Sequence, residues 1–588
     1  MPEPGPPNRR SVGDMATVAE NIVRTLHANG IDRVYGIPGD SLNGFTDALR
    51  KDGTIRWVHV RHEEAAAFAA AADAALTGDL AVVAGSCGPG NLHLINGLYD
   101  ANRSRVPVLA IAAHIPTSEI GTGYFQETHP QDLFRECSVY VEYVADPRQM
   151  PRLLEIAMRA AIEERGVAVL VIPGDVALAD IDDDRAVVIE RARPVVVPSG
   201  AELERAATLL NSAERVTILA GAGVEGAHDE VVALADRLGA PIVHALRGKE
   251  FIEYDNPFDV GMTGLLGFAS GYRAMEAADT LLVLGSDFPY EQFYPERATT
   301  IQVDIRGSQL GRRHPLDLGL VGDVRATAEA LLPRLAAKTD RTHVDDATAH
   351  YRKTRAKLDD LAVPSKGSRP IHPQYLARLL DERAADDAVF TADVGSPTVW
   401  AARYLTMTEG RRLIGSFTHG SMANALMHGI GAQVAEPGRQ VVALAGDGGL
   451  SMMLGELLTL TQNGLPVKTV VVNNSSLNFV ELEMKAAGFV TYGTGLQNPS
   501  FAAIAEAMGI FARRVERSDE LPAALDEVLA HDGPALLDVV TERQELSMPP
   551  AIEAAQVKGF ALYAIRTVMS GRGDELLDLA RANWRQLF

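Results

Sequence analysis

The chain of 588 residues is too long for one hydrophobic core, and its length predicts about three domains. Its composition, 47% hydrophobic and 22% charged, is typical of a globular protein. The formal net charge of −22 argues against a nucleic-acid partner and gives no long-range attraction to anionic lipid. The two cysteines, Cys87 and Cys137, are too few for a disulfide framework and indicate a reducing cytoplasm.

The chain lacks the sequence signals of a membrane span and of a secretory leader. No apolar run approaches the roughly 18 residues that a transmembrane helix needs. The first 14 residues, MPEPGPPNRRSVGD, contain no apolar core of a signal peptide. We therefore expect residues 1–14 to form a disordered extension before the first domain.

The first expected domain, residues 15–197, alternates strands with helices and glycine-rich turns. The expected elements are helices 18–28 and 61–75 and strands 33–36, 54–60, 80–84 and 168–172. Such alternation predicts a parallel α/β sheet. An acid cluster at 180–184 and a proline-flanked segment at 193–198 are typical of a linker that closes the domain.

Two features of this domain are candidates for function. Glu63 lies at the start of an alanine-rich helix, where an acid is favourable without having any further role. The segment from Gly121 to Glu127, which contains Phe125 and Gln126, is too polar and glycine-rich for a core strand. It is either a plain surface loop or a loop that carries functional side chains.

The second expected domain, residues 198–345, contains a GxGxxG pattern, Gly221 to Gly226, after a strand. This pattern is a weak dinucleotide signal, and the next strand, 241–245, ends without the acid that would hold a ribose. Acids instead follow later strands, Asp287 after 281–286 and Asp304 after 300–303. Asp304 is either a turn residue or an acceptor for ribose hydroxyls.

The third expected domain, residues 346–544, contains the strongest signal in the chain. A β-branched run (441–445) ends in Gly446-Asp447-Gly448-Gly449, an apolar segment of helical period follows (452–460), and a second run (467–472) ends in Asn473-Asn474. This order predicts a parallel β-α-β unit whose strand ends open on one crevice. Asp447 and Asn474 should therefore face one site.

The chemistry of these strand ends favours a metal-bound diphosphate. Carboxylate and amide oxygens are hard ligands of the kind that Mg²⁺ prefers, and Mg²⁺ completes its octahedron with water and phosphate oxygens. The glycines beside Asp447 allow backbone N–H groups to approach a diphosphate closely. The alternative is an ordinary turn whose polar residues cap a helix.

The GDG motif followed 27 residues later by NN resembles the metal-diphosphate motif of the thiamine-diphosphate enzymes of the acetolactate synthase-like family. The adjoining residues, Ser475-Ser476-Leu477-Asn478-Phe479-Val480 and then Glu483-Met484-Lys485-Ala486, resemble those of the bacterial quinone-dependent pyruvate dehydrogenases, also called pyruvate oxidases. The resemblance extends over nearly the whole chain from Met15 onward.

This resemblance implies an α/β fold of three doubly wound parallel-sheet domains, followed by an amphipathic C-terminal helix. The domains would bind the thiamine pyrimidine (15–197), FAD (198–345), and the diphosphate with Mg²⁺ (346–544), and residues 545–588 would form a membrane-binding tail. The implied metal ligands are Asp447, Asn474 and Ser476. The implied cofactor contacts are Glu63, Gly420, Ser421, Met422, Asp447, Gly448, Gly449, Asn474, Ser475, Ser476, Leu477, Asn478, Phe479 and Val480 for thiamine diphosphate, and Thr263, Gly264, Leu265, Leu266, Ser286, Asp287, Phe288, Pro289, Tyr290 and Asp304 for FAD.

The resemblance also implies individual roles. Glu63 would bond N1′ of the aminopyrimidine, and Met422 would wedge the cofactor into a bent shape. Phe125 and Gln126 would lie near the reacting carbon. Phe479 would aid electron transfer, although Asn478 precedes it where glycine is usual in the family.

The implied FAD site has two further candidates. Arg247 and Lys249 would face the FAD diphosphate. Like the other FAD contacts, they lie in the expected second domain.

The implied activity is oxidative decarboxylation of pyruvate to acetate and CO₂, with electrons passing from hydroxyethyl-thiamine diphosphate to FAD and then to a membrane quinone, ubiquinone in type. The partners would be pyruvate, the quinone, and membrane lipid bound by a tail with one apolar face: Leu577, Ala580, Trp584, Leu587 and Phe588. Glu63 of one chain would face Asp447 of another in a homotetramer. The protein would be cytoplasmic and, when activated, peripheral on the inner face of the cell membrane.

Three alternatives stay open at this point. A carboligase of the acetolactate synthase type would use the same cofactors without a lipid-binding tail. A phosphate- and oxygen-dependent pyruvate oxidase is a second variant. A non-catalytic cofactor-binding regulator would have lost Glu63, Asp447 or Asn474, and all three are present.

Overall fold

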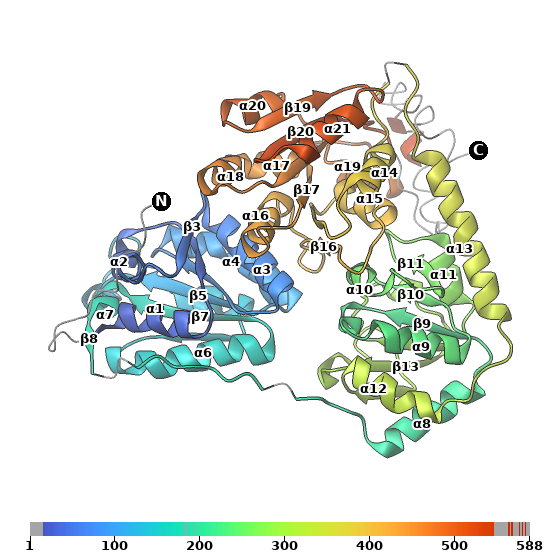
Figure 1. Cartoon of the computed structure of the whole chain (residues 1–588), viewed down its shortest axis with the longest axis horizontal. Coiled ribbons are helices and arrows are strands. Elements are labelled where there is room, and N and C mark those ends of the chain that lie inside the picture. The colour runs from blue at the N-terminus through green and yellow to red at the C-terminus, as the bar shows by residue number, and fades with distance from the viewer. Residues whose placement is uncertain are drawn as a thin grey trace. The chain divides into compact units, whose positions relative to one another are not determined.

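The computed structural model describes residues 16–182, 185–192, 194–367 and 369–545, together with eight positions of the C-terminal stretch (562–564, 566, 567, 576, 579 and 583). These residues form two compact units (Figure 1). The first contains the chain up to Ala192 together with 418–438 and 453–465, and the second contains the remaining residues. The expected extension at 1–14 and the apolar face of the expected tail lie outside the described residues.

The first unit is built on a six-stranded parallel sheet in the order β3-β2-β4-β5-β7-β6. Its strands are β2 (Arg33–Gly36), β3 (Arg56–His59), β4 (Ala81–Gly85), β5 (Val108–His114), β6 (Tyr140–Tyr143) and β7 (Val167–Pro173), and a separate antiparallel pair is formed by β1 (Ala16–Thr17) and β8 (Asp180–Ile181). Its helices are α1 (Val18–Ala28), α2 (Asn43–Asp52), α3 (Glu63–Thr77), α4 (Pro89–Ser104), α5 (Pro130–Phe134), α6 (Met150–Glu164) and α7 (Gly174–Leu178). Helices α1, α2 and α6 cover one face of the sheet, and α3 and α4 cover the other (Figure 1).

Helix α3 is a buried helix made largely of alanine, and it packs closely against two neighbours. Its residues Ala65 to Ala72 are all buried. A Cβ on Gly97 of α4 would lie 2.5 Å from the Ala67 side chain. A Cβ on Gly431 of α16 (Ala425–Ala435) would lie 2.0 Å from the Ala69 carbonyl oxygen. Because glycines lie at these crossings, α4 and α16 can pack closely against the helix that begins with Glu63.

The Gly431 crossing yields a stability prediction. Gly431→Ala should lower the free energy of unfolding by about 1–3 kcal/mol, because the new methyl group meets a backbone atom that cannot move aside, and this cost exceeds the gain in helix propensity. Chemical denaturation of the variant checks it. Gly438→Ala is the matched control, since a Cβ there meets nothing within 4 Å, and equal stability of the two variants would contradict the prediction.

The second unit contains two further six-stranded parallel sheets. The middle sheet, in the order β11-β10-β9-β12-β13-β14, follows residues 194–199. Its strands are β9 (Val216–Ala220), β10 (Ile242–His244), β11 (Asp259–Met262), β12 (Thr280–Leu284), β13 (Thr299–Asp304) and β14 (Leu318–Val321). Its helices are α8 (Gly200–Ser212), α9 (His228–Leu238), α10 (Lys249–Ile252), α11 (Ala269–Glu276), α12 (Val324–Leu331) and α13 (Thr342–Leu361).

The third sheet has the order β16-β15-β17-β18-β20-β19. Its strands are β15 (Val389–Ala392), β16 (Arg412–Ile414), β17 (Val441–Gly446), β18 (Lys468–Asn473), β19 (Phe511–Val515) and β20 (Ala535–Val540). The helices of this part of the chain are α14 (Pro373–Arg383), α15 (Ser396–Tyr404), α16, α17 (Asp447–Met452), α18 (Leu457–Asn463), α19 (Asn478–Ala486), α20 (Phe501–Ala507) and α21 (Leu521–Ala530). Helices α16 and α18 belong to the first unit.

The prediction of three parallel α/β sheets is confirmed, and so is the β-α-β unit around Asp447. Strands β17 and β18 pair in parallel with Gly446 opposite Val472, so both ends reach the same edge. The helix between them differs from the prediction of 452–460. It begins at Asp447 itself and is broken, because α17 ends at Met452 and α18 starts at Leu457.

Lys468, the first residue of β18, yields a prediction about pH. Burial lowers the pKa of its ammonium group from its ordinary 10.5 to about 8, while Nζ donates to the carbonyls of His531 and Gly533. Between pH 8 and 10.5 the unfolded chain therefore binds the proton more tightly, and this group's contribution to folding stability rises with pH. Wild-type protein should gain up to about 3 kcal/mol over that range relative to Lys468→Met. Denaturation curves of both proteins at pH 7.5 and 10 check this, and parallel pH dependences would contradict it.

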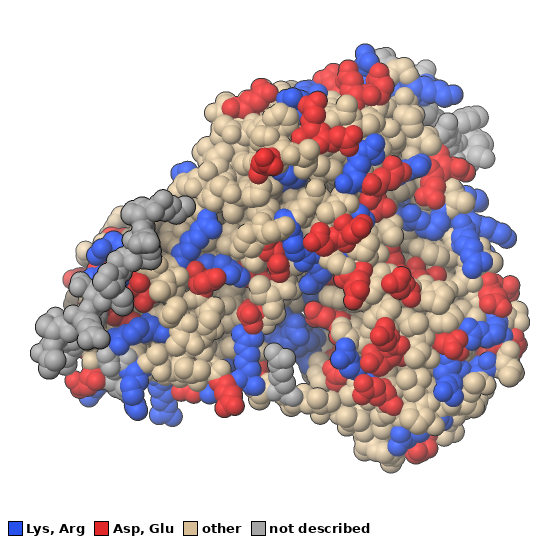
Figure 2. Space-filling view, viewed as in Figure 1, with Lys and Arg blue, Asp and Glu red and all other residues tan. Residues whose placement is uncertain are grey.

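The surface carries mixed charge. On the face shown in Figure 2, acidic and basic side chains are interspersed, without one patch of a single sign. In the described part of the chain, no helix combines the length and the apolar character that spanning a membrane requires.

Candidate functional site

Asp447 starts α17 at the carboxyl end of β17, and its carboxylate is held from three sides. Oδ1 accepts from the Gly448 N–H at 2.9 Å. Oδ2 accepts from the Ser475 N–H and from Asn498 Nδ2, both at 2.7 Å. The residue is 3% exposed, and burial raises the pKa of its carboxyl group. The carboxylate is therefore fixed in orientation and removed from water.

Asn474 and the two serines after it form the opposite side of this strand-end site. Asn474 is buried, and its Oδ1 accepts from the Ser476 N–H at 3.0 Å. Ser475 has a φ of +55°, in the left-handed region that residues with a Cβ seldom adopt. This turn aims the Ser475 N–H at Asp447 while β18 ends beside β17. The structure thus brings Asp447 together with the segment 474–476, as the sequence predicts.

These residues fit a hard divalent cation. The buried Asp447 carboxylate forms no ion pair with any described side chain, and a charge buried in this way is normally compensated. Asn474 Oδ1 accepts one hydrogen bond and keeps a second lone pair. The N–H groups of the helix that begins at Asp447 add a partial positive charge suited to phosphate oxygens.

A second layer of residues behind Asp447 was missed by the sequence analysis. Asn498 Nδ2 donates to Asn473 Oδ1 as well as to Asp447, and Asn473 Nδ2 donates to Asp538 Oδ1 at 2.9 Å. Arg514 completes the chain by donating to Asp538 Oδ2 at 2.6 Å. Asn498 lies 51 residues after Asp447 in a loop, so no spacing rule could have found it.

Asn498 should therefore control metal affinity without being a ligand. Asn498→Ala removes one of the two donors to Asp447 Oδ2, and we expect the affinity for Mg²⁺ to fall about 10- to 100-fold, as for other residues that orient metal ligands. Titration of the apoprotein with Mg²⁺ and thiamine diphosphate measures this. Asn256→Ala, at an amide that serves only the loop between Ile252 and Phe258, is the control. Equal affinities of the two variants would contradict the assignment.

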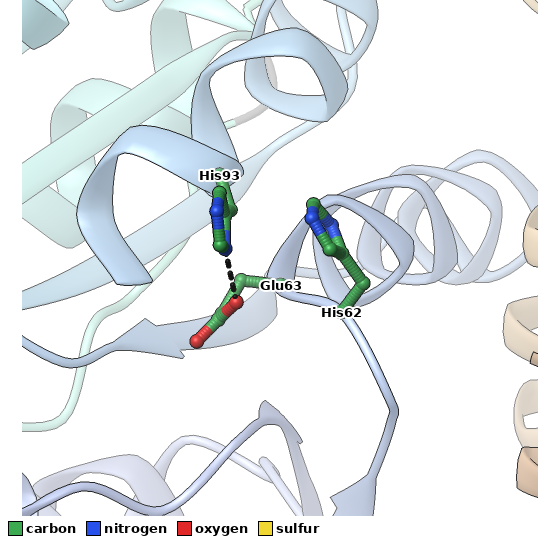
Figure 3. Close-up of side chains that lie close together, drawn as sticks. All are labelled: His62, Glu63 and His93. Atoms are coloured by element: carbon green, nitrogen blue, oxygen red, sulfur yellow. Dashed lines mark hydrogen bonds and ion pairs between the residues drawn. The ribbon is translucent and has the colours of Figure 1, made fainter. Parts of the chain in front are cut away.

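In the first unit, Glu63 begins α3 and contacts a histidine of α4. Its Oε2 lies 2.8 Å from His93 Nδ1 (Figure 3). Its Oε1 makes no hydrogen bond within the described part of the chain, and a Cβ on Gly90 would lie 3.1 Å from it. His62, the N-cap of α3, stacks on His93 with ring centroids 4.2 Å apart. The neighbouring Glu64 is different, because its Oε1 accepts from Asn96 Nδ2.

The loop from Gly121 to Glu127 is organised by its own last residue. The Glu127 carboxylate accepts from the N–H groups of Gly121, Gly123 and Tyr124, and the Gly121 bond is the main cause of its lowered pKa. Gln126 has a φ of +63°, and its Oε1 accepts from Cys87 Sγ at 3.2 Å. Phe125 is 76% exposed. The loop thus presents an uncovered aromatic ring beside a constrained amide.

The segment before α16 is also constrained. Gly420 and Ala423 both have positive φ, +86° and +59°, on either side of the partly exposed Met422. Ser421 Oγ donates to the Met422 carbonyl and accepts from Asn96 Nδ2. Six described residues other than glycine have a positive φ, and three of them, Gln126, Ala423 and Ser475, lie in segments that the sequence nominates; the others are Arg105, Arg165 and Asp255. Such strain accumulates at functional sites.

In the middle sheet, the residues nominated for FAD follow three strand ends. Thr263 and Ser286 are buried, and their hydroxyl oxygens find no partner among the described residues. Orphaned buried hydroxyls of this kind fit a bound polar group. Gly264 (φ +92°) keeps the chain turned after β11. Asp304, at the end of β13, accepts from the Arg306 N–H, and Asp287 pairs with Arg313 at 2.8 Å.

The remaining nominated segments are packed into the second unit. Leu265 and Leu266 border hydrophobic clusters, and the Leu266 carbonyl accepts from Arg403 Nε. The Phe288 carbonyl accepts from the Tyr294 hydroxyl, and the following residues, Pro289 and Tyr290, are exposed. Leu265, Leu266 and the segment 288–290 thus follow the same strand ends as Thr263 and Ser286.

Two glycines of the GxGxxG pattern are already engaged within this sheet. The Gly221 and Gly223 N–H groups donate to the carbonyls of Leu284 and Gly285, so the glycines serve contact between neighbouring loops. Lys249 is likewise engaged, because it is 2% exposed and ion-paired with Glu253. Its role at the FAD diphosphate stays a prediction.

Helix α19 follows the metal-site turn directly. The Leu477 N–H donates to the Thr494 carbonyl, and Ser476 Oγ donates to Glu481 Oε2 at 2.6 Å. Asn478 Nδ2 donates to the Arg543 carbonyl, so the residue that replaces glycine anchors the start of the helix. Phe479 packs against the core of the third sheet, while Val480 is exposed.

The chain is similar to known proteins over most of its length. Three family models match it: the N-terminal thiamine pyrophosphate binding domain over residues 16–133, the central domain of thiamine pyrophosphate enzymes over 203–331, and the C-terminal thiamine pyrophosphate binding domain over 393–539. One match falls on each of the three sheets, although β6, β7 and β15 lie outside the matched residues, and the matches include the Glu63 helix and the Asp447 to Asn474 unit.

Two named relatives match nearly the whole chain, and an uncharacterized relative matches part of it. A pyruvate oxidase of Lactiplantibacillus plantarum is 31% identical over 529 residues, covering 88% of this chain and 87% of the relative. An acetolactate synthase isozyme 2 large subunit of Escherichia coli is 33% identical over 544 residues, covering 90% and 96%. An uncharacterized protein of Pseudomonas amyloderamosa is 61% identical over 355 residues, covering 60% and 90%.

Proposed function

Because the chain belongs to the thiamine pyrophosphate-dependent enzymes, we propose that it decarboxylates pyruvate oxidatively to acetate and CO₂. Two electrons pass through FAD to a membrane quinone, so that pyruvate, water and quinone give acetate, CO₂ and quinol. The observation that carries the proposal is the buried Asp447 carboxylate, which lies beside Asn474 without a cationic partner in the described part of the chain.

The residues that would hold the cofactors have separate tasks. Asp447 and Asn474 would bind Mg²⁺, and the N–H groups of Gly448 and Gly449 would approach the diphosphate. Glu63 keeps Oε1 available for the pyrimidine ring while Oε2 is bound to His93. Once bound, thiamine diphosphate supplies the electron sink that decarboxylation of a 2-keto acid needs. Met422 would shape the cofactor, and Phe125 and Gln126 would border the substrate.

The FAD proposal rests on the second unit. The hydroxyls of Thr263 and Ser286, which find no partner among the residues described, and the acid Asp304 lie at the carboxyl ends of β11, β12 and β13. Ligands of doubly wound sheets bind at this edge. Phe479, one residue into α19, would assist electron transfer to the flavin.

The oxidative outcome is favoured by the residues after Asn474. The run from Ser475 to Val480, followed by Glu483 to Ala486, resembles the quinone-dependent pyruvate dehydrogenases, and one relative is named a pyruvate oxidase. The amphipathic pattern at residues 574–588 would serve membrane lipid and access to quinone. The same resemblance supports a homotetramer that works at the inner face of the cell membrane.

A second candidate function is carboligation of the acetolactate synthase type. Another relative, 33% identical, bears that name, and its activity would use the same metal site. A pyruvate oxidase that uses phosphate and oxygen is a variant of the first proposal. The three reactions consume pyruvate and differ in their products.

One assay separates these functions. Purified holoenzyme is incubated with pyruvate and either a soluble ubiquinone analogue or ferricyanide, with and without phospholipid vesicles, and acetate, acetyl phosphate and acetolactate are quantified. The proposal predicts acetate in step with acceptor reduction, enhanced by vesicles. Acetolactate as the main product would establish the carboligase, and acetyl phosphate formed with oxygen consumption would establish the phosphate-dependent oxidase.

A further inference from the structure

Glu63 is a buried carboxyl group with one side-chain link toward solvent. Its side chain is 9% exposed, whereas that of its partner His93 is 42% exposed. The link joins Glu63 Oε2 to His93 Nδ1 over 2.8 Å (Figure 3). Within the described part of the chain, Glu63 makes no other side-chain hydrogen bond. Protons that reach or leave this carboxyl group therefore have a defined route.

The second nearby histidine does not provide that route. His62 Nδ1 accepts from the Glu64 N–H at 3.2 Å, so this nitrogen carries no proton. Burial lowers the pKa of His62, and the neighbouring His93 lowers it further. His62 stacks on His93 and makes no hydrogen bond to Glu63. It serves as the N-cap of α3 and as a flat support for the His93 ring.

The outer side of His93 opens on a pocket in the first unit. This pocket has a volume of about 660 Å³, and its lining includes His62, His93, Asn96, Tyr99 and His419. Two other polar groups there are already engaged, because His419 Nε2 is bonded to Asn96 Oδ1 and Asn96 Nδ2 to Glu64. His93 is thus the pocket residue that contacts Glu63 directly.

We propose that His93 carries protons between Glu63 and solvent. In one direction, Nδ1–H gives its proton to Glu63 Oε2 while Nε2 takes a proton from water in the pocket. In the other direction, Glu63 returns the proton to Nδ1, and Nε2 releases one to water. The two half-steps together restore the starting tautomer of His93. A complete cycle therefore needs no proton donor or acceptor other than Glu63 and water.

This inference rests on the proposed role of Glu63 at the pyrimidine ring, and it extends that role. A cofactor proton that is passed to a buried carboxyl group must still reach solvent before the next turnover. Imidazole is suited to this task because its two nitrogens can accept and donate at the same time near neutral pH. The geometry provides both ends of the path, with one nitrogen on Glu63 and the ring edge in an open pocket.

The test measures exchange of the C2 proton of bound thiamine diphosphate with D₂O in metal-buffered holoenzyme, without pyruvate or electron acceptor. His93→Gln keeps a donor toward Glu63 and loses the relay, whereas His93→Ala loses both. Tyr99→Phe changes the same pocket at a hydroxyl that donates to Glu136 and not to Glu63, and it is the matched control. Exchange should slow at least about tenfold in both His93 variants and remain within about twofold of wild type in the control. Calorimetry should show a Kd for thiamine diphosphate within about threefold of wild type in His93→Gln.

Added imidazole separates a relay from a positioning role. The pocket leaves room for it, so 50 mM imidazole should restore exchange in His93→Ala, while an isosteric non-base such as cyclopentanol should not. Wild-type exchange in His93→Gln would overturn the relay, and so would slow exchange in His93→Ala that imidazole fails to restore. Since this exchange needs no pyruvate and no quinone, failure of the oxidoreductase proposal would leave the result interpretable.

Discussion

Asp447→Asn is expected to lower the affinity for Mg²⁺ and thiamine diphosphate at least about 100-fold, a larger loss than for residues that only orient a ligand. The substitution removes the charge that faces the metal. It also replaces one carboxylate oxygen by an NH₂ group, which faces either the Gly448 N–H at the Oδ1 position or the Ser475 N–H and Asn498 Nδ2 at the Oδ2 position. The variant thus loses a ligand and gains an unfavourable donor–donor contact.

Asp447→Asn should raise the folding stability of the apoprotein, whereas it should lower the stability of the protein with its ligands bound. Burial raises the pKa of the Asp447 carboxyl, so wild-type apoprotein bears a desolvation cost at neutral pH that asparagine relieves. With ligands at 100 times their Kd, wild type should gain about 2.7 kcal/mol of stability. The variant should gain almost none.

Thermal unfolding with and without Mg²⁺ and thiamine diphosphate measures this difference. Asp175→Asn is the matched control, because Asp175 also follows a strand but is exposed and accepts from the Thr117 N–H. An equal ligand-induced shift in Asp447→Asn and wild type would remove Asp447 from the metal site.

Glu63→Gln is expected to lower kcat by roughly 10²- to 10⁴-fold while leaving cofactor affinity nearly unchanged. Glutamine keeps the size of the side chain and can still accept from His93 through its carbonyl oxygen. It cannot accept or return a proton. The loss should therefore appear in the chemical step and not in the assembly of the site.

The adjacent acid provides the control for this second prediction. Glu64 has the same chemistry, but its carboxylate is bound to Asn96. Glu64→Gln should keep kcat within about threefold, because an amide can replace that contact. Steady-state kinetics with pyruvate, together with the rate of C2 proton exchange, distinguish the two residues. Similar losses in both variants would refute the assignment of Glu63.

Local sequence patterns predicted much of the fold. Helix α1 and strand β2 appear where periodicity placed them, since each has a regular apolar repeat bounded by turn residues. The helix after Asp447 was misplaced because its glycine-rich first turn has no apolar period. Tertiary contacts, including the bond from Ser475 to Asp447, hold that turn in helical form.

The partners of the site residues could not be predicted. No motif marks Asn498, Asp538 or Arg514. They form the layer of hydrogen bonds behind Asp447 only because β18, β20 and β19 pair side by side. No sequence pattern singles out His93, since a spacing of 30 residues from Glu63 follows no local period.

The sequence by itself determined the three α/β sheets, the polar side chains at the strand ends and the acid at the start of an alanine helix. These depend on short-range patterns and on residue chemistry, which a single chain displays directly. Only the tertiary structure decided that Asp447 is buried without a cationic partner in the described part of the chain, that Lys249 is committed to Glu253, and that Glu63 meets His93. Such pairings depend on strand order and helix packing, which bring distant residues within hydrogen-bond range.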